Sequence, residues 1–326
     1  MTLTVFNNEA EWLNAKAGCI SSTESAALFG MSPYLTAYEL AVEKIGMLAP
    51  ADIGGDTRVR WGKRLQDAIA QGMADDYRLL IEGQEFVFAV HNDEPRMGAS
   101  YDYRIIGVKE AAEFDRDPII DLYREHGPGL LEIKNVDALI YRDWPLPDAP
   151  DHIEIQVQHQ LEVANVEWAA IAVLIGGNRE EIFLRRRDKQ VGEAIRERIH
   201  KFWRDIQAGT LPPPIMPEDA NIVIKLHQYA EPGLVFNGQN DLALESLCEE
   251  YDSAREVAKK AEQAQRALTA QILTHIGDAE RALVSGFNVS AGMVAPTEVK
   301  AHTRGSYRNC RITRKRSGKN QTRTAE

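Results

Sequence analysis

Cysteine is scarce in this sequence, which holds only Cys19, Cys248 and Cys310 among its 326 residues. The three lie far apart and form no C-x-x-C pair. That spacing excludes a zinc site recognisable from sequence and a disulfide-stapled scaffold. Because unpaired cysteines persist in reducing compartments, we expect a cytoplasmic protein.

Long apolar runs are missing as well. No stretch of about 18 consecutive apolar residues occurs, so the sequence predicts no membrane span and no membrane partner. Asn7, Asn8, Glu9 and Glu11 stand where a secretory signal peptide would need an apolar run. We therefore expect no signal peptide, in agreement with a cytoplasmic location.

Two common catalytic frames are also absent from the sequence. No G-x-x-x-x-G-K-[ST] loop is present, which argues against an ATPase that unwinds strands. No G-x-S-x-G turn is present to carry a serine nucleophile. The remaining composition, 44% hydrophobic and 27% charged, is typical of a globular protein with a large core.

Positive charge is in deficit, since 38 Lys and Arg stand against 49 Asp and Glu for a net charge of −11. At face value this argues against a nucleic-acid partner, because phosphate binding needs positive charge. The charge is polarised, however: residues 298–326 carry +7 and residues 1–297 carry −18. This basic tail, with Arg314, Lys315 and Arg316, is either a solubilising end or an arm for nucleic-acid phosphates.

Helical and strand patterns alternate through residues 1–210, which predicts an α/β (α+β) domain with a mixed central sheet flanked by helices. Residues 168–175 form a continuous apolar run, typical of a strand that is buried on both faces. Residues 108–129 are charged and read as a long loop or inserted excursion. The expected helices of this domain are 22–28, 36–46, 58–77, 152–165 and 192–208. The other expected strands are 85–90, 101–107, 130–136 and 181–185.

Three consecutive prolines, Pro212 to Pro214, end this pattern and place a domain boundary there. We expect a Pro-rich linker over 211–240, a long helix with a small C-terminal region over 241–297, and the basic tail. The helix carries an apolar stripe of the coiled-coil type. It could be an arm of a helical hairpin, a coiled-coil partner, or a helix packed on its own domain.

The strongest chemical signal joins Asp102 on one predicted strand to Glu132, Ile133 and Lys134 on another. Strand side chains alternate, so Glu132 and Lys134 point to the same face, and Asp102 can join them if the two strands are neighbours. Two carboxylates and the Ile133 carbonyl suit a hard ion such as Mg²⁺ or Mn²⁺. Lys134 could then hold or deprotonate an attacking water. A surface ladder of ion pairs is the alternative interpretation.

An ordered set of motifs over residues 12 to about 208 resembles the YqaJ-type viral recombinases, the lambda-exonuclease-like branch of the PD-(D/E)xK nuclease superfamily. The motifs, in chain order, are Trp12 with Lys16, Ile20 to Tyr34, Tyr38 to Gly46, Trp61 to Gln66, Gly98 to Asp102, Glu132 to Lys134, and Gln156 to Leu161.

The resemblance implies a restriction-endonuclease-like core and site roles. Asp102 and Glu132 would bind the metal, and Lys134 would be the catalytic lysine. Gln156 and Gln158 would lie on the active-site helix. Phosphate contacts would come from Lys16 and from a turn that opens a helix, with Ser22, Thr23 and Ser25.

The activity implied is Mg²⁺-dependent digestion of linear double-stranded DNA, with 5′-to-3′ polarity, in a bacterial host or as a prophage product. A single-strand annealing protein is the implied partner, and relatives form trimers. Catalysis by a RecB-like repair or defence endonuclease is one alternative. A catalytically weakened protein that binds DNA or recruits a partner is another.

Two departures from the family pattern bear on these alternatives. Gln66 stands where the family has a helix Glu near the metal, which removes a charge from the site. Either Asp67 substitutes for it, or fewer carboxylates hold the metal, or activity is reduced. The connection from Asp102 to Glu132 is long for the family and contains many acidic residues.

Overall fold

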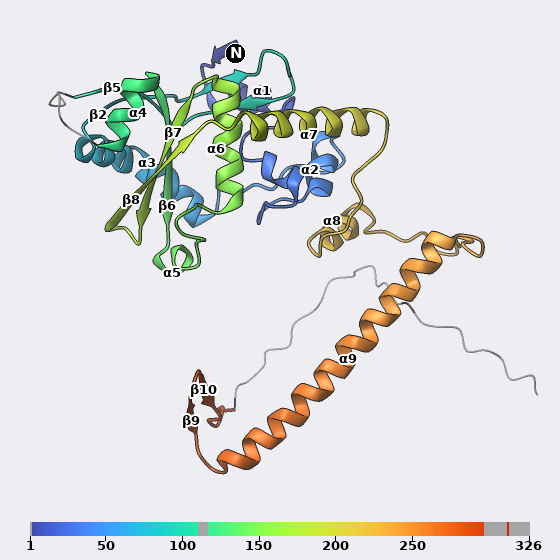
Figure 1. Ribbon diagram of the computed structural model, residues 1–326. Coiled ribbons are helices and arrows are strands. Elements are labelled where there is room, and N and C mark those ends of the chain that lie inside the picture. Colours follow the sequence, from blue (N-terminus) through green and yellow to red (C-terminus); the bar gives the residue numbers. More distant parts are fainter. Residues whose placement is uncertain (1, 110–116, 297–311, 313–326) are drawn as a thin grey trace, which may run out of the picture. The chain divides into compact units, whose positions relative to one another are not determined.

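The protein is represented by a computed structural model that describes residues 2–109, 117–296 and 312. It divides into two units, one ending at Leu226 and the other beginning at His227 (Figure 1). Arg314, Lys315 and Arg316 of the basic tail lie outside the described residues, as do Glu110, Glu113 and Asp115 of the acidic segment.

The first unit is built around a five-stranded sheet with the order β2-β5-β6-β7-β8. The β6 and β7 strands pair in parallel, whereas β2–β5, β5–β6 and β7–β8 pair antiparallel. The strands are β2 (Leu79–Gly83), β5 (Tyr103–Val108), β6 (Gly129–Val136), β7 (Trp168–Ile175) and β8 (Arg179–Arg186). The expected α/β core with a mixed central sheet is confirmed.

Helices cover both faces of this sheet (Figure 1). Alternate residues of β7 explain why: Ile171 and Val173 belong to one buried cluster, and Ala170 and Ala172 to the other. The first cluster packs under α6 (Asp151–Ala164) and α7 (Lys189–Gln207), the second under α3 (Thr57–Asp76) and α4 (Pro118–His126). The prediction of a strand buried on both faces is confirmed.

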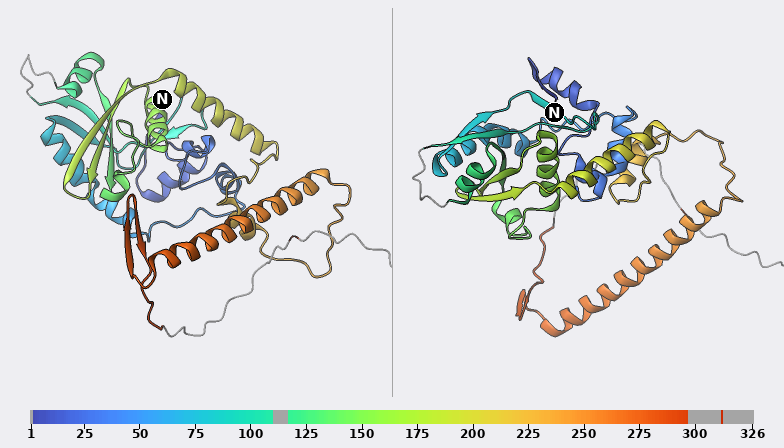
Figure 2. Two further views of the ribbon diagram at one scale, coloured as in Figure 1. Left: turned by 60° about the horizontal axis from the view of Figure 1, so that its bottom comes forward. Right: turned by 45° about the horizontal axis from the view of Figure 1, so that its top comes forward.

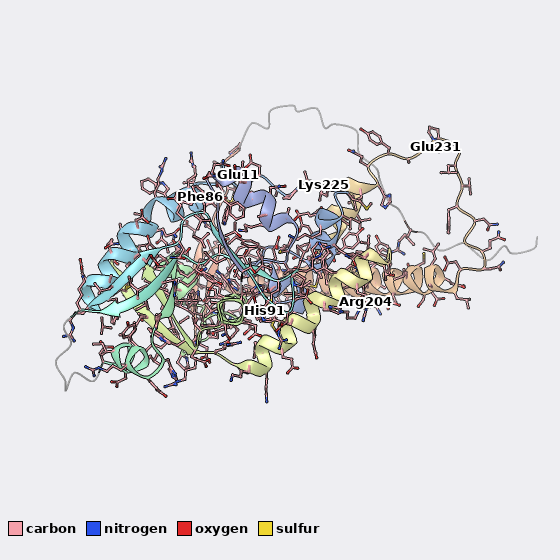
Figure 3. All side chains as sticks on the ribbon, turned by 90° about the horizontal axis from the view of Figure 1, so that it is seen from above. Glu11, Phe86, His91, Arg204, Lys225 and Glu231 are labelled. Atoms are coloured by element: carbon pink, nitrogen blue, oxygen red, sulfur yellow. The ribbon has the colours of Figure 1, made fainter. Side chains whose placement is uncertain are left out.

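A small antiparallel sheet with the order β1-β3-β4 stands beside the main sheet. Trp12 of α1 packs edge-to-face on Phe86, at the start of this sheet, and its indole N–H donates to the Val87 carbonyl (3.2 Å) and to Ser100 Oγ (3.0 Å). Figure 3 labels Glu11 and Phe86 on this part of the unit. The elements here are β1 (Thr2–Val5), α1 (Glu9–Ala17), η1 (Ser25–Phe29), α2 (Ala37–Lys44), β3 (Val87–Val90) and β4 (Gly98–Ala99).

The segment 108–129, expected to be a loop or excursion, contains helix α4. Asp117 caps the first turn by accepting a hydrogen bond from the Ile119 N–H (3.0 Å), and Pro118 begins the helix. Ile119 and Ile120 are buried in the core. The short apolar face of this helix is difficult to recognise in the sequence because charged residues surround it. The prediction of a loop is therefore wrong for the part of 108–129 that forms α4.

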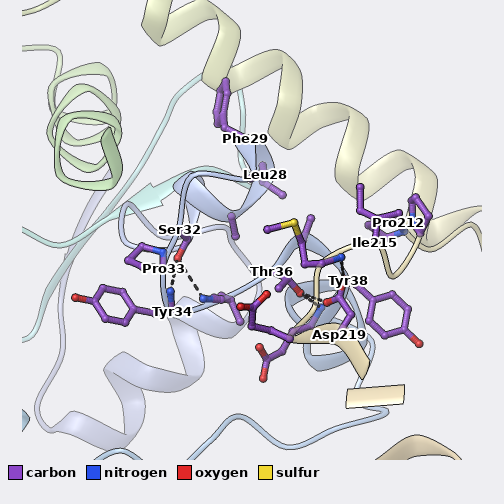
Figure 4. Close-up of a pocket in the computed structure, with 18 of the residues that line it drawn as sticks. Leu28, Phe29, Ser32, Pro33, Tyr34, Thr36, Tyr38, Pro212, Ile215 and Asp219 are labelled. Atoms are coloured by element: carbon purple, nitrogen blue, oxygen red, sulfur yellow. Dashed lines mark hydrogen bonds between the residues drawn. The ribbon is translucent and has the colours of Figure 1, made fainter. Parts of the chain in front are cut away.

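The first unit continues past the prolines at 212–214 to helix α8 (Asp219–Leu226). Asp219 is buried, accepts a hydrogen bond from the Thr36 hydroxyl (2.5 Å) and accepts another from the Met216 N–H (2.8 Å). Ile222 packs on Tyr38 of α2. Figure 4 shows Thr36 and Asp219 in a cavity of about 590 Å³ between these segments. The stretch expected as a linker over 211–240 therefore includes a packed helix.

The second unit holds the long helix α9 (Leu242–Ile276) and a hairpin of β9 (Arg281–Val284) and β10 (Phe287–Ser290). Helix α9 begins at the cap Asp241, which accepts a hydrogen bond from the Leu244 N–H (2.9 Å). Figure 2 shows α9 as one uninterrupted helix. Among the described residues, no helix has both the length and the apolar character needed to cross a lipid bilayer.

The close approach of Gly129 to Trp168 makes a stability prediction. A Cβ at Gly129 would lie 2.5 Å from the indole of Trp168, which is fully buried. Gly129→Ala should therefore lower the free energy of unfolding by about 1–3 kcal/mol through overpacking. Gly72→Ala is the matched control, because a Cβ at this position of α3 meets nothing within 4 Å. It should raise stability by roughly 0.5–1 kcal/mol. Urea unfolding of both variants checks this, and equal effects would contradict it.

Candidate active site

The pairing of β5 with β6 brings the predicted acidic residues together. Tyr103, the first residue of β5, lies opposite Leu131, so Asp102 reaches the backbone beyond it. Asp102 Oδ2 accepts a hydrogen bond from the Ile133 N–H (2.9 Å). Glu132 and Lys134 share one face of β6, and Lys134 Nζ donates to Glu132 Oε1 (2.7 Å). The structure thus places Asp102, Glu132 and Lys134 in one cluster.

The Glu132 carboxylate is the most enclosed charge of this cluster, with only 5% of the residue exposed. Its Oε1 also accepts a hydrogen bond from Gln156 Nε2 (2.6 Å), and its Oε2 accepts one from Gln160 Nε2 (2.8 Å). Gln156 Oε1 in turn accepts a hydrogen bond from Lys134 (3.1 Å). A buried charge is tolerable only when it is paired and hydrogen-bonded, and this network provides both.

Helix α6 turns two glutamines, four residues apart, toward Glu132. The predicted site residue Gln158 is not one of them. Gln156 and Gln160 lie one turn apart on the face toward Glu132, because residues i and i+4 share a helix face. Gln158 lies outside the cluster. Its amide donates to the Arg186 carbonyl (2.9 Å) and accepts a hydrogen bond from the Asp188 N–H (2.8 Å). Gln160 was missed, although its spacing from Gln156 could have identified it.

Burial and charge shift the protonation equilibria of the cluster. Burial, and after it the charge of Glu132, raises the pKa of Asp102 to about 7, against the opposing effects of the Ile133 N–H and Lys134. Burial alone lowers the pKa of Lys134, but its attraction to Glu132 and Asp102 outweighs burial, so the pKa of Lys134 is raised. Lys134 is accordingly an ammonium group in this arrangement.

The position of Gln66 answers one question left open by the sequence. Its Nε2 donates a hydrogen bond to Asp102 Oδ1 (3.0 Å), so this amide occupies the place expected for a carboxylate. Asp67 does not substitute, because it is exposed and accepts a hydrogen bond from the Tyr103 hydroxyl instead. The site therefore contains two carboxylates rather than three.

The donor atoms of the cluster fit a hard divalent ion. In a strand, the N–H and C=O of one residue point to the same side, so the Ile133 carbonyl faces the side on which its N–H binds Asp102. This carbonyl and the carboxylates of Asp102 and Glu132 form an all-oxygen set of the kind that suits Mg²⁺, which keeps several waters. Among the described residues, no three His, Cys, Asp or Glu side chains gather as a metal-binding group. The remaining ligands would have to be water or substrate.

A cavity of about 510 Å³ opens at this cluster, and Lys16, Ser22 and Thr23 also line it. Lys16 Nζ lies 4.0 Å from the centre of the Trp12 ring, a cation–π contact. Burial lowers the pKa of Lys16, and although Glu24 opposes this, the nearby Lys44 and Lys63 add to it. The predicted phosphate contacts Lys16, Ser22 and Thr23 thus share a cavity with Asp102, Glu132 and Lys134.

Ser25, the fourth predicted phosphate contact of this segment, is turned away from the cavity. Its hydroxyl is fully buried and hydrogen-bonds His159 Nδ1, while His159 Nε2 lies 2.9 Å from the Gly98 carbonyl. The expected helix 22–28 is a five-residue 3-10 helix, η1, and the Ser21 N–H before it already donates to Glu24 (2.7 Å). The segment therefore opens no α-helix whose N-terminus could hold a phosphate, and of its predicted contacts Ser22 and Thr23 line the cavity whereas Ser25 does not.

Comparison with known proteins now places this site in a family. Residues 11–167, which contain every member of the cluster, match the family model described as the YqaJ-like viral recombinase domain. This part of the chain is a YqaJ-like viral recombinase domain. The resemblance seen in the motifs is confirmed.

One curated relative shares sequence with the YqaJ-like domain and beyond it. The uncharacterized protein YqaJ of Bacillus subtilis (strain 168) is 25% identical over 226 residues, which is 68% of this chain. The alignment spans 63% of that protein, less than two thirds of its length.

Two solved structures are similar to part of this chain. An alkaline exonuclease from Laribacter hongkongensis, LHK-Exo in complex with dAMP, is 14% identical with a TM-score of 0.43, over 66% of this chain and 97% of that chain. A phage-related exonuclease from Haemophilus somnus 129PT is 12% identical with a TM-score of 0.34, over 63% and 91%. The chemistry of the YqaJ-like site follows from its own residues.

The buried His159 behind the cavity makes a prediction about pH. Burial lowers its pKa to about 3, so the folded protein keeps His159 neutral while the unfolded chain binds a proton below pH 6.5. Stability therefore falls with falling pH, and the loss from this residue approaches about 1.4 kcal/mol per pH unit well below pH 6.5. Compared with His159→Gln, the wild type should lose about 1 kcal/mol more unfolding free energy between pH 6.5 and 5.5. A constant difference between the two proteins in urea unfolding would refute this.

Proposed function

We propose that this protein is a metal-dependent DNA nuclease that hydrolyses phosphodiester bonds with the cluster around Asp102, Glu132 and Lys134. The observation that carries the proposal is the meeting of the buried Glu132 carboxylate and the half-buried Asp102 carboxylate with an ammonium group, 2.7 Å from Glu132, in a cavity that a second lysine also lines. Buried carboxylates are costly unless a cation uses them. This arrangement can hold a phosphate between a divalent ion and Lys16.

Mg²⁺, with Mn²⁺ as a substitute, would be held by Asp102, Glu132 and the Ile133 carbonyl. When bound, the ion supplies Lewis-acid polarisation of the phosphoryl group and activation of water. The protein's own part is positioning and electrostatics. Two acceptors, Glu132 and Gln156, fix the Lys134 ammonium, which has three N–H donors. Lys134 can therefore direct its remaining donor at the reacting phosphate or the attacking water, where negative charge develops.

Ser22 and Thr23 extend the phosphate-binding wall of the cavity. Ser22 is 3% exposed and Thr23 is exposed, and both line the same cavity as the carboxylates. Hydroxyl groups and a lysine that share a cavity with a cleavage site suit contacts with the phosphates of the DNA backbone. We assign Lys16, Ser22 and Thr23 to the grip on the DNA backbone.

Membership of the YqaJ-like family supports the finer part of the proposal. The substrate would be linear double-stranded DNA, digested 5′-to-3′ in the cytoplasm of a bacterial host to leave single strands for an annealing protein. A trimer, as expected from the family, would hold the enzyme on its substrate. Degradation of linear but not closed circular duplex would distinguish this exonuclease from a RecB-like endonuclease.

One observation favours a second candidate, a DNA-binding protein with weakened catalysis. The Gln66 amide donates a hydrogen bond to Asp102, which places a neutral group where a third carboxylate would strengthen metal binding. Calorimetric titration with Mg²⁺ separates the two candidates. A weakened protein should bind DNA but show no heat of metal binding that depends on Glu132.

The proposed roles predict the behaviour of three variants. Glu132→Gln and Lys134→Ala should each lower Mg²⁺-dependent degradation of end-labelled linear duplex by about a hundredfold or more. Gln158→Ala is the matched control, since Gln158 lies on the same helix as Gln156 but bonds Arg186 and Asp188 instead. It should retain activity. If both Glu132→Gln and Lys134→Ala keep their activity and their circular dichroism is unchanged, these residues do not form the active site.

Gln66→Glu should restore a third carboxylate beside Asp102. The Mg²⁺ concentration for half-maximal activity should fall by about tenfold, because an added carboxylate strengthens the ion's site. In EDTA the variant should melt at a lower temperature than the wild type, since three carboxylates repel one another, and Mg²⁺ should reverse this. An unchanged Mg²⁺ dependence together with unchanged melting in EDTA would show that position 66 does not act on the metal.

A further inference from the structure

Helix α9 exposes an apolar face that the other described residues of its unit do not bury. Leu247, Leu268 and Ile272 are 63%, 57% and 46% exposed, and none of the 35 residues of α9 is buried. Within residues 227–296, all of which the structure describes, no residue is buried. The β9–β10 hairpin cannot replace a core, because a two-stranded hairpin is marginally stable by itself. A helix with such a stripe gains its stability from packing against a partner.

The exposed stripe has the spacing of a coiled coil. Steps of three and four residues alternate without a break over more than four heptads. This length and spacing are those of a helix that packs along its whole seam against another helix. The residues at these positions are Leu244, Leu247, Tyr251, Ala254, Ala258, Ala261, Gln265, Leu268, Ile272 and His275.

Acidic residues gather in the first half of α9 and basic residues in the second half. This division favours a partner helix with the opposite order of charges. The first half is acidic, with Arg255 as its only basic residue among residues 245–256. The second half, residues 257–276, is basic apart from Glu262. The acidic residues are Glu245, Glu249, Glu250, Asp252 and Glu256, and the basic ones are Lys259, Lys260 and Arg266. A second α9 running in the opposite direction brings each acidic half against a basic half.

We propose that α9 pairs with α9 of a second copy of this chain in an antiparallel coiled coil. In the register centred between Lys259 and Lys260, Ala258 meets Ala261 at the centre. Tyr251 then meets Leu268, so apolar layers continue on either side of the small central residues. A parallel pair would instead set the two acidic halves side by side.

Charges beside the seam agree with this register. Arg255 and Glu262 both flank the stripe on the same side, and antiparallel pairing sets Arg255 of one helix opposite Glu262 of the other. Within the single chain, Arg255 pairs with Asp252 and also donates a hydrogen bond to the Ile312 carbonyl (3.1 Å), and Glu262 pairs with Arg266. The α9 pair uses no residue of the cavity around Glu132, and it would join two copies whether their YqaJ-like domains are single or belong to two separate trimers. It therefore stands or falls independently of the nuclease proposal.

The first test compares two leucines of α9 in the full-length protein. Leu268 lies in the stripe, whereas Leu273, 47% exposed, lies outside it. Light scattering across a concentration series should show wild-type self-association that Leu268→Glu weakens at least about tenfold, since each dimer loses two layers. Leu273→Glu should leave association unchanged. A monomeric wild type, or equal effects of the two substitutions, would overturn the proposal, and circular dichroism confirms that both variants remain helical.

The second test fixes the direction of the helices. Cys248 and Thr269 flank the stripe on the same side and face each other only in an antiparallel pair. Within one helix they are about 31 Å apart, too far for a disulfide. Thr269→Cys, with Cys310→Ser to remove another thiol, should give a disulfide-linked dimer under mild oxidation, and adding Cys248→Ser should abolish it. If light scattering shows a dimer but the crosslink does not form, the antiparallel register is wrong. If α9 associates only with another protein, the proposed pairing with a second copy of this chain is wrong.

Discussion

Burial of the Glu132 carboxylate is the constraint on which the site depends. Glu132 belongs to an inner strand of the sheet, and its side chain projects toward α6 rather than toward water. A carboxylate there requires a cation and hydrogen-bond donors, which Lys134, Gln156 and Gln160 supply. The same contacts fix the rotation of α6 about its axis, since only one face of the helix can present both amides to one carboxylate.

The orientation of α6 also positions the hydroxyls that line the cavity. With Gln156 and Gln160 turned to the sheet, His159 is turned to η1, where it holds the Ser25 hydroxyl and the Gly98 carbonyl. Those contacts anchor the turn that carries Ser22 and Thr23. The carboxylates and the hydroxyls that line the cavity are therefore positioned by neighbouring faces of one helix.

The carboxylate side of the site could be predicted from sequence, because it depends on a rule with one period. Alternation along a strand is sufficient to place Glu132 and Lys134 on one face, and Asp102 at the start of a neighbouring strand joins them. The helix side could not be predicted as well, because the sequence shows which glutamines share a face but not which face packs on the sheet. The sequence predicts Gln158 as a site residue, whereas in the structure Gln160 contacts Glu132 and Gln158 contacts Arg186. Only the position of β6 relative to α6 distinguishes the two glutamines. The fold was more predictable than the site, and α4 was missed because its apolar residues lie among many charges.

The acidic excess of the chain has a physical consequence for how DNA would be held. The +7 of the tail belongs to residues 298–326, so the residues around the site share in the −18 of residues 1–297. Of the lysines that line the cavity, Lys134 is already paired with Glu132 and Lys63 with Glu9. A duplex therefore meets few cations that are not engaged by acidic partners. In the proposed function its phosphates would be recognised at short range, by Lys16, by the hydroxyls of the cavity and by a divalent ion. An anionic body with so local a grip would release DNA readily between cleavage events, so prolonged digestion would depend on enclosure of the DNA rather than on electrostatic affinity.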